Sequence, residues 1–180
     1  MTAMTVRTAT ALISADEFLS QDYPIGSELI DGVVYVNDPG FRHQLLCSRI
    51  NEALLLWSLG VADRGRPGWG GNWVLSDKNV YKPDVWWTVI APEGTRNDGP
   101  PELAVEVRSP GTWHRDVGRK LARYREAGTR ELWLVDTPAN TVLVYREGAF
   151  AEPVEVGPGE KLTSPLLQGF VLPIDELFAG

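Results

Sequence analysis

The sequence predicts an α/β domain in which helices flank a mixed, twisted β-sheet. Three apolar, β-rich runs that begin near positions 84, 103 and 131 are bounded by proline, glycine and polar residues, as buried strands are. Two longer segments, 41–59 and 116–127, carry apolar residues at helical spacing, and each is followed by a glycine. We therefore expect a sheet built around the three runs and covered by the two helices.

Length and composition favour a single domain over residues 1–180. The 180-residue chain is 43% hydrophobic and 23% charged, which is an ordinary globular composition. Its most strongly apolar segment, 53–62, is far shorter than the roughly 20 residues of a membrane span, and the N-terminus lacks the apolar core of a secretory signal. We therefore expect a soluble cytoplasmic protein without a membrane partner. The formal net charge of −7 argues against non-specific coating of nucleic acid but allows a local basic cleft.

Turn and capping signals place the remaining elements. Before the first run we expect a helix from a Ser14–Glu17 capping box to about Gln21, a hairpin over 27–36 that turns at Asp31 and Gly32, a loop or irregular hairpin over 63–73, and a strand at 73–75. A loop at 91–99 should join the first two runs. After the 116–127 helix we expect strand 131–135, its hairpin partner 141–146, short strands at 153–156 and 170–173, and a helical turn at 175–178.

Two carboxylates occur where the pattern predicts buried strands. Asp84 opens the first run after Pro83, and Glu106 interrupts the second, Leu103–Val107. Burial of a carboxylate is costly unless a cation or a hydrogen-bond donor meets it, so two in one fold suggest a metal or proton-transfer site. If their strands are adjacent, Asp84 and Glu106 can converge on Mg²⁺, which binds few carboxylates and keeps several waters.

Two cations accompany these acids. Arg108 shares a strand face with Glu106, because residues two apart in a strand point the same way. Lys120, on the helix that follows, is the natural cation beside the attacking water and the scissile phosphate.

Structural alternatives stay open at each of these positions. Asp84 could cap a loop, Glu106 could form a salt bridge with Arg108 or Lys120, and Lys120 could pair with Asp116 four residues earlier. Glu28, at the start of the hairpin, could be an exposed strand end.

Two further polar residues lie on the 41–59 helix. The pattern favours a buried thiol at Cys47 over a nucleophile, and a satisfied core or groove histidine at His43.

Several motifs resemble one known family when they are taken in their fixed order. They are ELIDGVV, His43 in the long helix, PDV, Glu-Val-x-Ser-Pro, Asp-x3-Lys-x3-Tyr, Ala-Gly-x3-Leu-Trp-Leu-Val-Asp and GEKLTSPLLQGFVLPIDELF. The chain resembles the Uma family of restriction-endonuclease-like proteins, in the PD-(D/E)xK nuclease superfamily, over nearly its whole length. The resemblance implies a restriction-endonuclease-like core, a Mg²⁺- or Mn²⁺-dependent DNA endonuclease, and a homodimer.

The resemblance also implies a role for individual residues. It implies that Asp84, Glu106 and the Val107 carbonyl bind the metal, that Lys120 is a migrated active-site lysine, and that Glu28 is a helper acid. The usual superfamily lysine, two residues after the second acid, is Arg108 here. An arginine holds a phosphate bidentately, so Arg108 is expected to bind substrate rather than to orient water.

A basic ridge offers a way for an acidic protein to bind DNA. Arg115, Arg119 and Arg123 recur at i, i+4 and i+8 on the predicted helix and could follow a phosphate backbone, or could form an ordinary solvated face. Two other functions remain open: a catalytically silent nuclease-fold module that binds nucleic acid or a protein partner, and metal-dependent chemistry on another phosphate ester.

Overall fold

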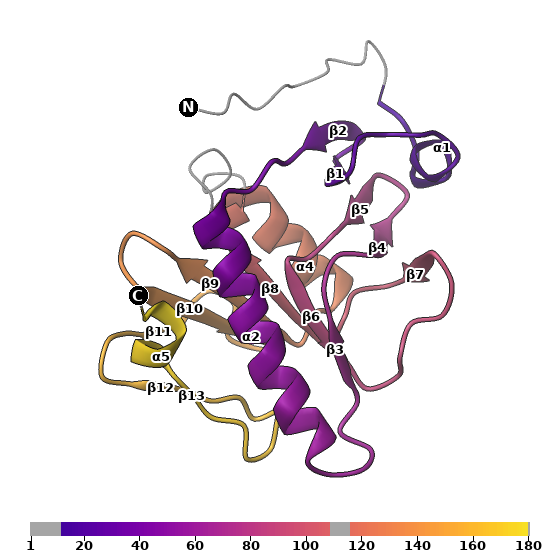
Figure 1. Cartoon of the computed structure of the whole chain (residues 1–180). Coiled ribbons are helices and arrows are strands. Elements are labelled where there is room, and N and C mark those ends of the chain that lie inside the picture. Colours follow the sequence, from indigo (N-terminus) through magenta and orange to yellow (C-terminus); the bar gives the residue numbers. More distant parts are fainter. Residues whose placement is uncertain (1–11, 109–115, 180) are drawn as a thin grey trace.

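The computed structural model describes residues 12–108 and 116–179 (Figure 1). Its largest sheet contains six strands in the order β11 (Val154–Val156), β10 (Thr141–Arg146), β9 (Glu131–Asp136), β8 (Leu103–Val107), β6 (Val85–Thr88) and β3 (Arg66–Gly68). Strands β8 and β9 are parallel, and the other neighbours are antiparallel. The predicted mixed sheet around the runs at 84, 103 and 131 is confirmed.

The two faces of strand β8 contribute to different cores. Leu103, Val105 and Val107 pack in the cluster that contains the buried side of α2 (Phe41–Leu59). Ala104 packs in a second cluster with Tyr124 of α4 (Leu121–Ala127). Because side chains alternate along a strand, Glu106 lies on the same face as Ala104, toward α4. The prediction that Val105 and Val107 face the core opposite to Glu106 is therefore confirmed.

A second sheet packs against α4 and carries the N-terminal hairpin. Its five strands, in order, are β2 (Val33–Val36), β1 (Ser27–Ile30), β5 (Asn79–Tyr81), β4 (Asn72–Ser76) and β7 (Arg96–Asp98). The hairpin turns where predicted, with positive φ at Asp31 (50°) and Gly32 (78°), as a two-residue type I′ turn requires. Tyr81 of β5 packs in the same cluster as Tyr124, so this sheet covers the face of β8 that carries Glu106.

The segment predicted as one helix over 116–127 has two parts. Residues Asp116–Lys120 form a π-helical turn, labelled η1, and α4 continues to Ala127, where Gly128 ends it as predicted. Single π-helical turns are rare and occur often at functional sites, because the wider turn redirects one side chain. Lys120 is the last residue of this turn.

The long helix and the capping box also agree with the sequence. Helix α2 has the predicted bounds, and α1 (Ala15–Leu19) begins with the Ser14 capping box but ends two residues earlier than expected. The C-terminal segment forms the two-stranded sheet β12 (Lys161–Leu162) and β13 (Leu172–Pro173), followed by α5 (Ile174–Phe178). None of the helices in the described part of the chain is long and apolar enough to cross a membrane.

The sequence pattern did not predict four short strands. β3 lies in 63–73, which was predicted as a loop or irregular hairpin, β7 lies in the predicted loop 91–99, and β5 and β12 were not expected. Each has two or three residues, which is too few for a period-two pattern, so pairing with a neighbouring strand decides its conformation. At β3, a Cβ on Gly68 would lie 2.3 Å from the Trp86 ring, so only glycine lets this edge strand pair so closely with β6.

Candidate functional site

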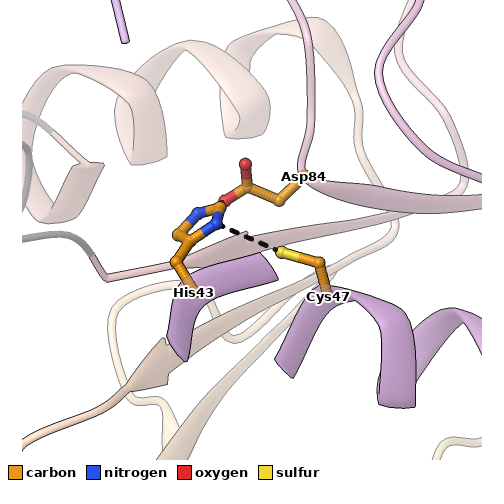
Figure 2. A group of neighbouring side chains, drawn as sticks. All are labelled: His43, Cys47 and Asp84. Carbon is orange, nitrogen blue, oxygen red and sulfur yellow. Dashed lines mark hydrogen bonds and ion pairs between the residues drawn. The ribbon is translucent and has the colours of Figure 1, made fainter. Parts of the chain in front are cut away.

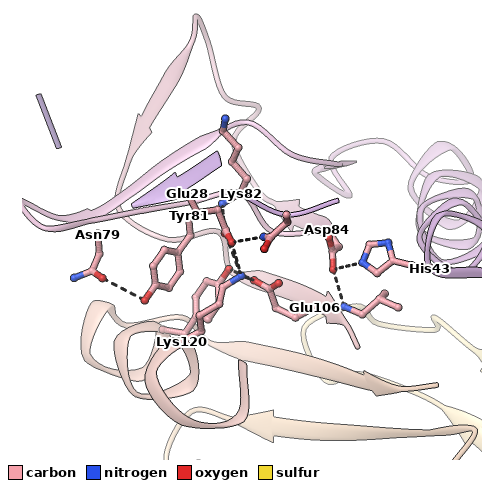
Figure 3. A network of polar contacts seen from close by, with 11 residues as sticks. Glu28, His43, Asn79, Tyr81, Lys82, Asp84, Glu106 and Lys120 are labelled. Atoms are coloured by element: carbon pink, nitrogen blue, oxygen red, sulfur yellow. Dashed lines mark hydrogen bonds and ion pairs between the residues drawn. The ribbon is translucent and has the colours of Figure 1, made fainter. Parts of the chain in front are cut away.

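One predicted acid, Glu106, lies on β8, and the other, Asp84, directly precedes the neighbouring strand β6. β6 and β8 pair antiparallel with Val85 opposite Val105, so the next position in the register places Asp84 opposite Glu106. Residues directly opposite in such a pair have Cβ atoms about 4.5–5.5 Å apart. The two carboxylates have different partners, because that of Asp84 turns toward α2 while that of Glu106 turns toward Lys120 (Figure 3).

Asp84 is held through one of its two oxygens. Oδ2 accepts a hydrogen bond from the Val107 backbone N–H at 2.8 Å and lies 3.0 Å from His43 Nε2. No hydrogen bond to Oδ1 is present among the residues that the structure describes. The side chain is 24% exposed, so it is reached from solvent. Val107 contacts Asp84 through its backbone N–H. That the Val107 carbonyl binds a metal ion stays a prediction.

Lys120 is buried between two carboxylates. Its Nζ lies 2.7 Å from Glu106 Oε1 and 3.1 Å from Glu28 Oε1, and its side chain is 2% exposed. Removal of an ammonium and two carboxylates from water is expensive, and their mutual attraction compensates only in good geometry. The structure thus brings together three of the predicted residues, from a strand of each sheet and from the turn before α4.

Glu28 is a central residue of this network and not an exposed strand end. It accepts hydrogen bonds from the Lys82 backbone N–H (Figure 3) and from Asn37 Nδ2, both at 2.9 Å. These two donors orient the carboxylate that meets Lys120. The sequence could not show this burial, because it arises when β1 pairs with β5.

Tyr124 donates a hydrogen bond from its hydroxyl to Glu106 Oε1 at 2.7 Å. Burial raises the pKa of Tyr124 well above its ordinary value, and the negative charge of Glu106 raises it further. Burial also raises the pKa of Tyr81, whose ring lies 5.3 Å from Lys120 Nζ. Both phenols are therefore neutral at physiological pH, and Tyr124 acts as a fixed donor.

His43 and Cys47 complete the surroundings of Asp84 (Figure 2). His43 Nδ1 lies 3.5 Å from Cys47 Sγ, and both side chains are buried. The predictions of a satisfied histidine and a buried thiol are confirmed. Burial raises the pKa of the Cys47 thiol, with a further contribution from the charge of Asp84, so the isolated thiol is protonated. Sequence reasoning missed that His43 contacts Asp84; the only signal was its position on the long helix, four residues before Cys47.

The predicted substrate-binding arginines are not gathered at one place. The Arg108 guanidinium lies 2.7 Å from Asp136 at the end of β9, and Arg123 lies 2.9 Å from Asp31 and 2.5 Å from Glu126. Hydrogen bonds to Glu126 and Asp31 raise the pKa of Arg123. Arg119 is exposed, and Arg115 lies outside the described residues. Of the predicted ridge, therefore, Arg123 already has carboxylate partners and Arg119 faces solvent.

The charges of the site favour a cation. Three carboxylates lie in this region: those of Glu28 and Glu106 contact the Lys120 ammonium, and that of Asp84 contacts His43. Hard divalent ions prefer oxygen ligands, and Mg²⁺ in particular uses one or two carboxylates and keeps waters. A pair of carboxylates on β8 and just before β6, with Asp84 24% exposed to solvent, fits such an ion.

Two comparisons bear on the family and the fold. The Uma2 family model, described as "Putative restriction endonuclease", matches residues 15–175. Among solved structures, the chain is similar to a crystal structure from Anabaena variabilis described as "a putative nuclease belonging to DUF820". The two share 22% identity with a TM-score of 0.82, over 93% of this chain and 98% of that chain, which confirms the α/β fold. No curated protein matches the chain.

Proposed function

Because the chain belongs to the Uma2 family, we propose that it is an endonuclease that hydrolyses phosphodiester bonds of DNA with Mg²⁺ or Mn²⁺. One observation carries the proposal: Asp84, directly before β6, continues the β6–β8 register to the position opposite Glu106, and the buried Lys120 ammonium lies 2.7 Å from Glu106. Asp84, Glu106 and Lys120 follow one another along the chain as the acidic pair and the lysine do in the superfamily that the chain resembles.

Asp84, Glu106 and the Val107 carbonyl would hold the metal ion. When bound, such an ion lowers the pKa of a coordinated water and polarises the phosphate. The Val107 N–H keeps Asp84 Oδ2 in place, which leaves Oδ1 to face an ion. The hydroxyl of Tyr124 restrains Glu106 in the same way from the opposite core.

Lys120 would place positive charge beside the attacking water and the scissile phosphate. A preorganised donor in a site from which water is excluded stabilises developing negative charge more than the same group in water. Glu28 keeps the ammonium near Glu106, so we assign it the role of positioning residue for Lys120. Arg108 lies at the end of β8 and pairs with Asp136. A phosphate of the substrate that took the place of Asp136 as its partner would give Arg108 a substrate-binding role.

Nicking of supercoiled plasmid is the test. Wild-type protein should nick DNA with Mg²⁺ or Mn²⁺ and not with a chelator, and Asp84→Asn and Glu106→Gln should each abolish nicking. Asp77→Asn is the matched control, because Asp77 is a solvent-exposed acid that pairs with Lys78 outside this network. Equal nicking by all four proteins would reveal a contaminating nuclease and remove the proposal.

A catalytically silent binding module is the alternative function. In that case the contacts among Lys120, Glu28 and Glu106 would be a structural ion-pair cluster, which buried charge networks also form. Wild-type protein that binds DNA but does not nick it with either metal would support this alternative.

Two further expectations accompany the endonuclease proposal. The family resemblance implies a homodimer, which sedimentation velocity would measure directly. A DNA substrate agrees with the cytoplasmic location expected from the sequence, and fluorescence microscopy of a tagged chain would test that location.

A further inference from the structure

His43, Cys47 and Asp84 bring an imidazole, a thiol and a carboxylate together beside the acidic pair (Figure 2). One potential ligand atom from each residue lies within 4.8 Å of the other two. His43 and Cys47 come from consecutive turns of α2, while Asp84 comes from the segment just before β6. The cluster therefore joins two elements that pack against each other in the main core.

The helical spacing of the first two residues suits chelation. Residues four apart on a helix lie on the same face, and zinc sites on helices use this i, i+4 arrangement. Neither side chain needs a large movement, because His43 Nδ1 already lies 3.5 Å from Cys47 Sγ. Ligands that are four positions apart on a rigid helix lose little conformational freedom when they bind an ion.

The donor set selects a different ion from the one proposed for the acidic pair. Nitrogen, sulfur and oxygen donors together suit Zn²⁺, Co²⁺ and similar borderline ions, whereas Mg²⁺ takes oxygen ligands. Three protein ligands also leave a fourth tetrahedral position open for water or substrate. The Val107 N–H donates a hydrogen bond to Asp84 and would thereby orient this carboxylate toward an ion.

We propose that His43, Cys47 and Asp84 form a binding site for a zinc-class divalent ion. On binding, a metal–sulfur bond replaces the S–H bond of Cys47, and the thiol proton passes to solvent. His43 binds as neutral imidazole, and Asp84 exchanges its hydrogen bond with His43 for a bond to the ion. One proton is released for each ion bound, and no electron is transferred.

Asp84 belongs to both proposed sites, and this has a consequence for regulation. An ion held by His43 and Cys47 takes up the carboxylate that the Mg²⁺ site needs. If the chain is an endonuclease, zinc-class ions should therefore inhibit it in competition with Mg²⁺. Only this consequence rests on the proposed function; the binding site itself does not.

Cobalt spectroscopy tests the site without any activity measurement. Co²⁺ added to the wild-type chain should produce a thiolate-to-cobalt charge-transfer absorption that saturates at one equivalent and disappears when Zn²⁺ displaces the cobalt. Cys47→Ser should abolish this absorption. It should also weaken Zn²⁺ binding in calorimetry by more than about 10-fold, because loss of a residue that only hydrogen-bonds a metal ligand already costs about 10-fold. His43→Gln should weaken Zn²⁺ binding similarly.

Glu106→Gln is the matched variant, because it changes the neighbouring proposed site and spares these three ligands. It should retain the cobalt absorption while it loses nicking. Circular dichroism would confirm that each variant is folded, and Cys47→Ala would replace Cys47→Ser if the buried serine prevents folding. Three results would each overturn the proposal: no charge-transfer band in the wild type, equal Zn²⁺ affinity in wild type and folded Cys47 variant, or loss of the band in Glu106→Gln.

Discussion

The Lys120 ammonium lies 3.1 Å from Oε1 of Glu28, a residue 92 positions earlier in the chain. The same ammonium contacts Glu106, so one buried side chain joins β1 of the second sheet to β8 of the main sheet. Assembly of the candidate site and packing of the two sheets are therefore coupled. Loss of this cation should affect both stability and chemistry.

Lys120→Met should destabilise the fold strongly. It leaves Glu28 and Glu106 buried without their cation, and removal of one partner of a buried ion pair costs about 3–5 kcal/mol. Lys78→Met is the control, because Lys78 pairs with Asp77 at an exposed site, where ion pairs contribute about 1 kcal/mol at most. Urea unfolding would measure the free energy of unfolding of both variants. Similar losses in the two variants would show that the buried contacts contribute no more than exposed ones.

The same substitution should reduce nicking by roughly 100-fold or more, the typical effect of removing one preorganised electrostatic contact. Activity would be compared at a temperature where circular dichroism shows the variant to be folded. Calorimetric Mn²⁺ affinity should persist, because Lys120 repels the cation rather than binding it. Folded Lys120→Met with wild-type nicking would exclude a catalytic role for this lysine.

The sequence was informative where a polar residue broke an apolar pattern. Asp84 opens one predicted strand and Glu106 interrupts another, and Lys120 lies on the helix expected after the second strand. The register of β6 with β8 then brings the two acids together, as expected if the strands were adjacent.

What the sequence could not show depends on contacts between distant elements. Glu28 is buried only because β1 pairs with β5, and His43 reaches Asp84 only because α2 packs across β6. Arg123 meets Asp31 because the hairpin turn lies beside α4. No periodicity within one segment contains these contacts, so a basic ridge and an exposed strand end were reasonable expectations.

Tyr124→Phe should cost more stability than Tyr81→Phe, although both remove one hydroxyl from the same core. Tyr124 donates to the Glu106 carboxylate at 2.7 Å, and a hydrogen bond to a charged group contributes about 1.5–3 kcal/mol. Tyr81 donates to the neutral Asn79 side chain at 3.3 Å, where about 0.5–1.5 kcal/mol is typical. Equal midpoints in urea for the two variants would show that Glu106 gains nothing from this donor.

Glu131 and Glu17 should affect the pH dependence of stability in opposite directions. Burial raises the pKa of Glu131 from its ordinary 4.5, so the folded state binds its proton more tightly than the unfolded state. Its contribution to stability is intact below pH 4.5 and is lost as pH rises through the raised value. Hydrogen bonds from Ser14 lower the pKa of Glu17, so its contribution is present above pH 4.5 and is lost on acidification.

Urea unfolding of Glu131→Gln and Glu17→Gln across this pH range would check both signs. Relative to the wild type, Glu131→Gln should gain stability as pH rises above 4.5. Glu17→Gln should lose stability relative to the wild type as pH rises toward 4.5, and this difference should stay constant above 4.5. The same slope for both variants would contradict the assigned environments.

The exposed Arg119 should contribute more to DNA binding than Arg123, which already has two carboxylate partners. Each phosphate contact changes the slope of log affinity against log salt by about 0.9. We therefore expect Arg119→Ala to flatten the slope by about one unit, Arg123→Ala to change it less, and the triple variant that includes Arg115→Ala to flatten it most.

Arg125→Ala is the control, because Arg125 is exposed but lies two positions beyond Arg123, on another side of the helix. Fluorescence anisotropy with a labelled duplex at several salt concentrations would give each slope. An unchanged slope in the triple variant would show that this face is a solvated helix surface, and that DNA reaches Asp84 by another route.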